Sequence, residues 1–131
     1  MLGELFDELK KRGMWDNTMV VLTSDHGEEF WEHGDHSHFH TLYDEVLHIP
    51  LIVRYPDGFS DGKRVATPVR IEDIAPTIAK ALGLPQPPDW VGVPLQDLDA
   101  PRDIVGTLQL VKQGETMRAH SHVDGKDKWI D

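Results

Sequence analysis

The carboxylates and imidazoles of this chain are concentrated in one stretch of sequence. Six of the eight histidines lie between residues 26 and 48, and residues 13–53 contain no Lys or Arg. The carboxylates of that stretch are Asp16, Asp25, Glu28, Glu29, Glu32, Asp35, Asp44 and Glu45. Carboxylates packed closely without fixed cations repel one another, and a bound divalent metal ion relieves that repulsion. A solvated acidic loop is the alternative, because charge-rich segments commonly lie on the surface.

Asp25 and His26 are the candidate metal ligands. They closely follow the apolar run 18–23, and in open α/β sheets ligands bind beyond the carboxyl ends of the strands. Asp supplies a hard anionic oxygen and neutral His a nitrogen, while Gly27 leaves the backbone free to bend around the pair. The position of the dipeptide in the chain therefore predicts a metal site.

Five further histidines follow this pair in the sequence. His38 and His40 stand just before a predicted short helix, where main-chain N–H groups and the helix dipole favour an anion, so we interpret both as candidate substrate-binding residues. His33 and His36 lie among acids, where a solvent-facing side chain is the commoner outcome. His48 is explained by the dipole at the end of the same helix.

The hydrophobic pattern predicts the elements that position these residues. Apolar residues at helical spacing predict a helix over residues 2–12, which Gly13 terminates. Continuous β-favouring runs predict buried strands over residues 18–23 and 51–54. The polar residues 26–40 predict a long loop, and residues 41–47 a short helix. Since a helix joins the two strands, we expect a βαβ unit with parallel strands.

The second half of the chain adds a helix and weaker strand signals. Residues 71–82 have helical spacing, with Pro76 tolerated in the first turn. Residues 104–111 and 116–122 predict antiparallel edge strands. Together these elements predict an α/β fold, with a mostly parallel sheet flanked by helices and antiparallel strands near the C-terminus.

The overall composition excludes several classes of function. With 131 residues the chain is long enough for about one domain. Its formal net charge of -10 argues against nucleic-acid binding and against anionic membranes. It has no Cys, which excludes disulfides and thiolate zinc sites within it. No apolar run approaches the roughly 20 residues of a membrane span, so we expect a soluble chain. The sequence does not determine its cellular compartment.

Several segments of the sequence match a known family in order and spacing. They are residues 15–29 (WDNTMVVLTSDHGEE), 32–34 (EHG), 41–45 (TLYDE), 49–56 (IPLIVRYP), 71–78 (IEDIAPTI) and 83–84 (GL). In this order they resemble the C-terminal half of the catalytic domain of the sulfatase family, within the alkaline phosphatase superfamily. The resemblance covers residues 2 to 100 and is faint beyond them.

The resemblance implies an alkaline phosphatase-like partial domain that hydrolyses sulfate esters at a divalent metal ion. In such families the pair matching Asp25 and His26 coordinates the metal, for which Ca²⁺ is expected and Mn²⁺, Mg²⁺ or Zn²⁺ are alternatives. The position matching His38 lies beside the ester group, where it binds the ester oxygens or protonates the leaving group. Because Ser37 and Phe39 replace glycines of the family pattern, His40 is the alternative for that role.

The sequence departs from the family pattern at the nucleophile. Sulfatases carry it in a Cys/Ser-x-Pro-x-Arg motif, and this chain has no Cys and no Ser-x-Pro-x-Arg run. We therefore expect residues 1–131 to be a C-terminal segment of a longer catalytic domain, inactive by itself.

Two other functions stay open at this point. Many sulfatases carry Asn where His26 stands, and the His form occurs in phosphodiesterase-like and phosphonate monoester hydrolase relatives, so a phosphorus ester is the second candidate substrate. The third possible function is that of a non-catalytic metal-binding or interaction module. An uncovered sheet edge would then favour self-association.

Overall fold

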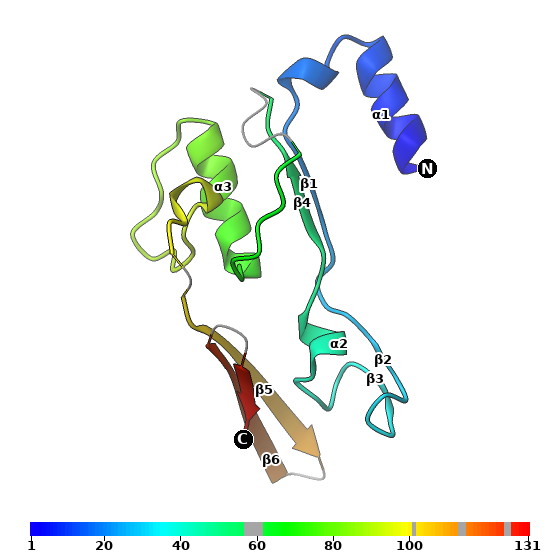
Figure 1. Cartoon of the computed structure of the whole chain (residues 1–131), viewed down its shortest axis with the longest axis vertical. Helices are drawn as coiled ribbons and strands as arrows, with labels where there is room; N and C mark the ends of the chain where they lie inside the picture. Colours follow the sequence, from blue (N-terminus) through cyan, green and yellow to red (C-terminus); the bar gives the residue numbers. More distant parts are fainter. Residues whose placement is uncertain (57–61, 101, 113–114, 125–126) are drawn as a thin grey trace. The chain divides into compact units, whose positions relative to one another are not determined.

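The computed structural model describes residues 1–56, 62–100, 102–112, 115–124 and 127–131 (Figure 1). Within it the chain divides into two compact units. The first comprises residues 1–24 and 50–65, and the second comprises residues 25–49 and 66–131. Among the described residues, no helix combines the length and the apolar composition needed to cross a membrane.

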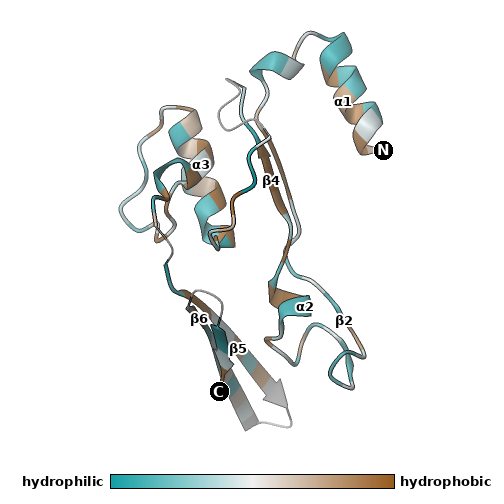
Figure 2. Ribbon diagram, in the orientation of Figure 1, coloured by the Kyte–Doolittle hydropathy of each residue, from teal (hydrophilic) through white to brown (hydrophobic). Residues whose placement is uncertain are grey.

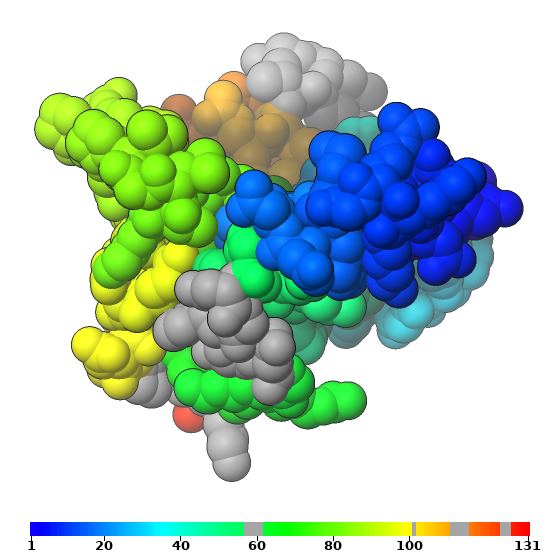
Figure 3. All heavy atoms as spheres, turned by 90° about the horizontal axis from the view of Figure 1, so that it is seen from above, coloured from blue at the N-terminus to red at the C-terminus, as the bar shows by residue number. Residues whose placement is uncertain are grey.

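The first unit begins with the predicted amphipathic helix. Helix α1 (Leu2–Lys11) has apolar and polar sides (Figure 2) and ends where Gly13 takes a φ of +67°, which glycine adopts without strain. A 3₁₀ turn follows (η1, Trp15–Asn17), and the rings of Phe6 and Trp15 lie 5.2 Å apart. In Figure 3, α1 and the turn that follows it form one continuous blue surface. The contact between Phe6 and Trp15 fixes the direction in which the chain leaves α1.

Two strands complete the first unit. Strands β1 (Val20–Thr23) and β4 (Leu51–Arg54) pair over four residues, from Val20 opposite Arg54 to Thr23 opposite Leu51. The Arg54 guanidinium lies over the Trp15 ring and donates hydrogen bonds to the Trp15 and Thr18 carbonyls at 3.0 and 2.7 Å. Arg54 thus ties the strand pair to the turn that precedes it.

The β1–β4 pair is antiparallel, so the prediction of a parallel βαβ unit is wrong. A parallel return needs a crossover connection, usually an α-helix that brings the chain back along the sheet. In residues 24–50, all of which the structure describes, the single helix is α2 (Asp44–Leu47), one turn long. Every strand pair among the described residues is likewise antiparallel. The expected mixture of helices and strands along the chain is confirmed.

The His-rich stretch opens the second unit. The predicted loop contains a short hairpin, β2 (Glu29–Phe30) paired with β3 (His36–Ser37). Trp31 and Ser37 have φ values of +72° and +90°, which are uncommon for residues with a side chain and mark the tight path of this hairpin. The predicted helix over 41–47 is confirmed in part, since α2 starts at Asp44.

A buried carboxylate organises the middle of the second unit. A 3₁₀ turn (η2, Ile71–Asp73) leads into α3 (Ile74–Ala81), and both lie within the helix predicted over 71–82. Asp73 is fully buried and accepts the N–H groups of Arg70 and Val93 at 2.7 and 2.9 Å. The Arg102 guanidinium forms an ion pair with the same carboxylate. A further 3₁₀ turn, η3 (Leu95–Asp97), is held by the bond from Leu95 N–H to Thr77 Oγ1 at 2.9 Å.

A three-stranded antiparallel sheet ends the chain. Strands β5 (Ile104–Lys112) and β6 (Glu115–Asp124) form an antiparallel pair as predicted. The prediction of two edge strands is wrong for β6, because β7 (Asp127–Ile130), a strand not predicted from the sequence, pairs with its other side. A Cβ at Gly106 would lie 3.4 Å from Leu47, so this sheet packs closely on the α2 region. Lys128 also donates a hydrogen bond to Asp44 at 2.6 Å. The C-terminal sheet thus packs against the His-rich stretch.

Candidate active site

Asp25 presents its carboxylate to solvent immediately after β1. One oxygen accepts the N–H of His26 at 3.0 Å, and the other lies 3.7 Å from His26 Nε2. Hydrogen bonding from main-chain N–H groups, those of Asp25 itself and of His26, is the main cause that lowers the pKa of the Asp25 carboxyl. The nearby His26 and His38 rings lower it further. The carboxylate is therefore held in the anionic form that a cation requires.

His26 is oriented so that one ring nitrogen is free beside Asp25. Its Nδ1 lies 2.7 Å from the Gly27 carbonyl oxygen, which can only accept, so Nδ1 carries the proton and donates it. Nε2 is then the nitrogen with the lone pair, as in metal-binding histidines that are oriented by a backbone carbonyl. Two ligand atoms that each lie about 2.0–2.6 Å from one ion can be 3.7 Å apart. The pair therefore fits a shared divalent ion.

Gly27 places this pair against α2. Its N–H donates to the Val46 carbonyl at 2.7 Å, and a Cβ at this position would lie 2.0 Å from the Glu45 carbonyl oxygen. Any side chain would push the two segments apart. Glycine is required here for the close approach of two backbones, which is a different role from the predicted bend around the Asp25–His26 pair.

His38 lies against His26. The two rings are stacked with centroids 3.7 Å apart and planes at 25°. His38 Nδ1 contacts both Glu28 oxygens, at 3.1 and 3.2 Å, so this nitrogen is the donor and Nε2 is left for other partners. The structure thus brings Asp25, His26 and His38 together. It adds Glu28, which the sequence analysis does not single out for this role.

His40 belongs to a different group of side chains. Its Nε2 lies 3.2 Å from a Glu29 oxygen and 3.9 Å from Asp35. The Glu29 side chain is only 1% exposed, and it also accepts the N–H groups of His33 and Asp35, at 3.1 and 3.4 Å. The described contacts of His40 therefore place it on Glu29, whereas those of His38 lie beside His26.

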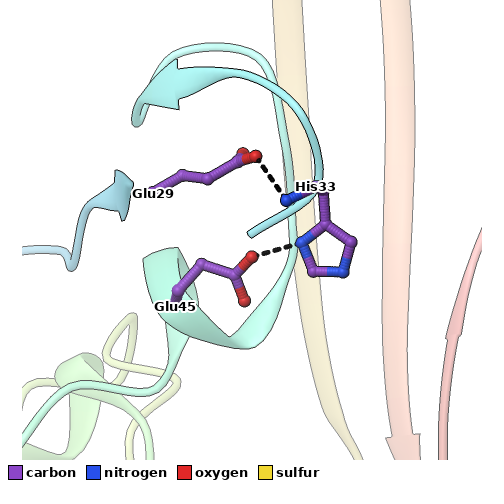
Figure 4. A group of neighbouring side chains, drawn as sticks. All are labelled: Glu29, His33 and Glu45. Carbon is purple, nitrogen blue, oxygen red and sulfur yellow. Dashed lines mark hydrogen bonds and ion pairs between the residues drawn. The ribbon is translucent and has the colours of Figure 1, made fainter. Parts of the chain in front are cut away.

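Glu29, His33 and Glu45 converge from β2, the hairpin loop and α2 (Figure 4). Their ligand atoms lie within 4.8 Å of one another, and His33 Nδ1 is hydrogen-bonded to Glu45. Two carboxylates at such a distance repel by about 3 kcal/mol or more at an effective dielectric constant of about 20. A positive charge between them is therefore favoured.

His33 and Glu45 are functional candidates that sequence reasoning missed. The His33 side chain is exposed to solvent as expected, and its ring is stacked on Tyr43 with centroids 3.6 Å apart. The absence of Lys and Arg from residues 13–53 marked the region, but the partners lie 12 residues apart and only the fold joins them. A pocket of about 440 Å³ opens beside this group, and its walls include Asp35 and His40 together with Ala119 and Ile130 of the C-terminal sheet.

Comparisons with known proteins identify the family of this chain. The family model described as Sulfatase matches residues 1–84. Arylsulfatase K of Danio rerio is 36% identical over 86 residues, which is 66% of this chain and 16% of that protein. The N-acetylglucosamine-6-O-sulfatase of Bacteroides thetaiotaomicron is 36% identical over 95 residues, 72% of this chain and 17% of that protein. The chain thus spans about a sixth of the length of these relatives.

Solved structures match nearly the whole chain. The phosphonate monoester hydrolase of Agrobacterium radiobacter superposes with a TM-score of 0.87 at 23% identity, over 99% of this chain and 30% of that one. BT4656 in complex with its substrate D-glucosamine-2-N,6-O-disulfate has a TM-score of 0.72 at 26% identity, over 98% of this chain and 28% of that one. The likeness confirms the alkaline phosphatase-like α/β class, present here as a partial domain.

Proposed function

The chain belongs to the sulfatase family, and from that premise we propose that it is the C-terminal part of a metal-dependent hydrolase of sulfate esters. The observation that carries the proposal is the geometry at His26. Its Nε2 lies 3.7 Å from the Asp25 carboxylate, and its ring is stacked on His38. A candidate metal ligand pair and a candidate ester-binding group therefore share one face of the second unit.

Asp25 and His26 would hold the divalent ion through Oδ2 and Nε2. When bound, such an ion neutralises negative charge that develops on the ester oxygens. Ca²⁺ is our first choice, with Mn²⁺, Mg²⁺ or Zn²⁺ as alternatives. A Ca²⁺ site takes six to eight oxygen-rich ligands, so two ligands from this chain leave most positions to other groups.

His38 would act on the ester itself. Glu28 holds its Nδ1, which fixes the ring and turns Nε2 toward other partners. In the imidazolium form, Nε2–H donates a hydrogen bond to a sulfate oxygen or a proton to the leaving group, while Nδ1–H stays on Glu28. Glu28 is thus a positioning residue for His38. His40, bonded to Glu29, is the alternative contact for the substrate anion.

The nucleophile would come from outside residues 1–131. The sequence contains no Cys and no Ser-x-Pro-x-Arg run, and it spans about a sixth of the length of the relatives above. We therefore propose that residues 1–131 are a C-terminal segment of the catalytic domain and turn over no ester by themselves.

A phosphorus ester is the second candidate substrate. His26 stands at a position where many sulfatases carry Asn and phosphonate monoester hydrolase relatives carry His. The preference of the whole enzyme is measured by giving it aryl sulfate and aryl phosphate in parallel.

A segment exchange tests the proposal. The segment of the Bacteroides N-acetylglucosamine-6-O-sulfatase that matches this chain over 95 residues would be replaced by the corresponding residues of this chain. We expect a folded chimera with sulfatase activity. That activity should fall about 10²-fold or more in His38→Ala and be lost in Asp25→Ala, while Asp16→Ala leaves it unchanged. A folded, active chimera that tolerates Asp25→Ala would refute the assignment of the metal ligands.

The isolated chain provides the complementary test. We expect no hydrolysis of 4-nitrophenyl sulfate or 4-nitrophenyl phosphate by residues 1–131 in Ca²⁺, Mn²⁺ or Zn²⁺. Robust turnover that disappears in Asp25→Ala would overturn the proposal that the nucleophile lies elsewhere.

A further inference from the structure

The group of Glu29, His33 and Glu45 has no part in the proposed reaction (Figure 4). It supplies one imidazole nitrogen and two carboxylate oxygens from three segments of the chain. A neutral imidazole among carboxylates is a donor set that suits Zn²⁺, Mn²⁺ or Co²⁺ better than Ca²⁺, which prefers oxygen throughout. The chemistry of the group therefore differs from that of a simple acidic surface.

The three side chains are held in place by their neighbours. Glu29 is buried and accepts hydrogen bonds from the N–H groups of His33 and Asp35 and from His40. The His33 ring is stacked on Tyr43 with planes at 15°, which directs Nδ1 toward Glu45. A site whose ligands are already oriented loses little conformational freedom on binding an ion.

The carboxylates of Glu29 and Glu45 need a positive counter-charge. Among the described residues that line the adjoining pocket there is no Lys or Arg. Lys128 of β7 is engaged with Asp44 of α2. Asp35, on the pocket wall, adds a further carboxylate beside the group. A metal ion bound to Glu29, His33 and Glu45 would supply that charge.

The group is accessible to an ion from solvent. The His33 side chain is 43% exposed, and the pocket of about 440 Å³ has Glu29 and His33 on its walls. The ion would reach its ligands without unfolding of the hairpin or of α2.

We propose that Glu29, His33 and Glu45 form a second divalent metal site, for Zn²⁺ or a similar transition metal, built from residues other than Asp25 and His26. Such an ion would join β2, the hairpin loop and α2. It would thereby brace the hairpin that carries His38, without taking part in ester hydrolysis. The proposal does not depend on the proposed function, since it concerns a site of different residues and a different ion.

The test begins with the full 131-residue chain carrying both Asp25→Ala and His26→Ala, so that the first site is absent. Calorimetric titration with ZnCl₂ is expected to show one bound Zn²⁺ per chain. Adding Glu45→Gln is expected to weaken this binding at least about tenfold. The matched control is Glu72→Gln, an exposed carboxylate outside the group that undergoes the same change of charge and shape.

A second measurement does not rely on removing a ligand. Co²⁺ bound to the same double variant is expected to give paramagnetic shifts of the His33 ring protons, with far-ultraviolet circular dichroism confirming that the variant is folded. Zn²⁺ binding that survives Glu45→Gln undiminished would place the ion on other histidines and overturn the proposal. Co²⁺ that leaves the His33 ring protons unshifted would also overturn it.

Discussion

At the scale of single residues, Asp25 shows how the fold controls the charge of a candidate ligand. Main-chain N–H groups, above all, lower the pKa of its carboxyl, although the side chain itself is in contact with solvent. Hydrogen bonds to a carboxylate favour its charged form. The ligand is therefore prepared for a cation by the backbone.

This arrangement predicts how Asp25 responds to acid. Because its pKa in the folded chain is lowered, ionised Asp25 favours folding above its ordinary pKa of 3.8, and this contribution is lost as the pH falls through the lower folded value. We expect the Asp25 carboxyl carbon to titrate at lower pH in the folded chain than in the chain unfolded by urea, as followed by carbon-13 NMR. Equal midpoints in the two states would contradict the hydrogen-bonding pattern.

The candidate site could be predicted from the sequence only where its residues are close in the chain. Asp25 and His26 are adjacent, so their joint presence beyond a strand follows from the local pattern. Glu29 and Glu45 are 16 residues apart and meet only because Gly27 allows the loop to approach α2. The charge pattern located the region, but it could not assign the pairs within it.

At the scale of elements, the contact between Gly27 and α2 makes a sharp prediction. Gly27→Ala would place a methyl group 2.0 Å from the Glu45 carbonyl oxygen, and relief requires backbone movement. We expect a loss of about 1–3 kcal/mol in the free energy of unfolding, measured by urea denaturation. Gly3→Ala is the matched control, because it adds a methyl group in open space on α1 and should stabilise by about 0.5–1 kcal/mol. Equal stability of the two variants would show that the loop does not pack on α2.

The types of the elements were more predictable than their pairing. The apolar run at Leu51–Arg54 and the spacing around Ile74–Ala81 gave a strand and a helix close to their observed bounds. The antiparallel direction of the β1–β4 pair could not be predicted from the sequence, because a continuous apolar run is compatible with a parallel or an antiparallel sheet. Strand β7 escaped notice because its four residues are too short for alternation to be distinguished from a turn.

At the scale of the whole molecule, apolar surface is left uncovered. Helix α1 has no buried residue, Leu5 is 53% exposed, and Ile52 in β4 is 63% exposed. A two-stranded ribbon with one amphipathic helix has only marginal stability on its own. Exposed apolar faces of this kind are typical of surfaces that bind another protein chain.

We therefore expect the isolated chain to self-associate in a concentration-dependent way, measured by sedimentation velocity. Leu5→Gln keeps the helix propensity nearly unchanged but removes apolar contact of about 1 kcal/mol per copy, or about 2 kcal/mol per dimer, so association should weaken about 30-fold. Lys11→Gln on the same helix is the control and should change little. A chain that stays monomeric at high concentration would contradict this expectation.

The buried carboxylate of Asp73 links segments that lie far apart in the sequence. Its two oxygens accept the N–H groups of Arg70 and Val93, while Arg102 supplies the counter-charge from beyond α3. We expect both amide protons to be protected from exchange with deuterium while the carboxylate stays in place. We therefore expect the helix, the Pro-rich segment after it and the entry to the last sheet to open together, as one cooperative unit of hydrogen exchange.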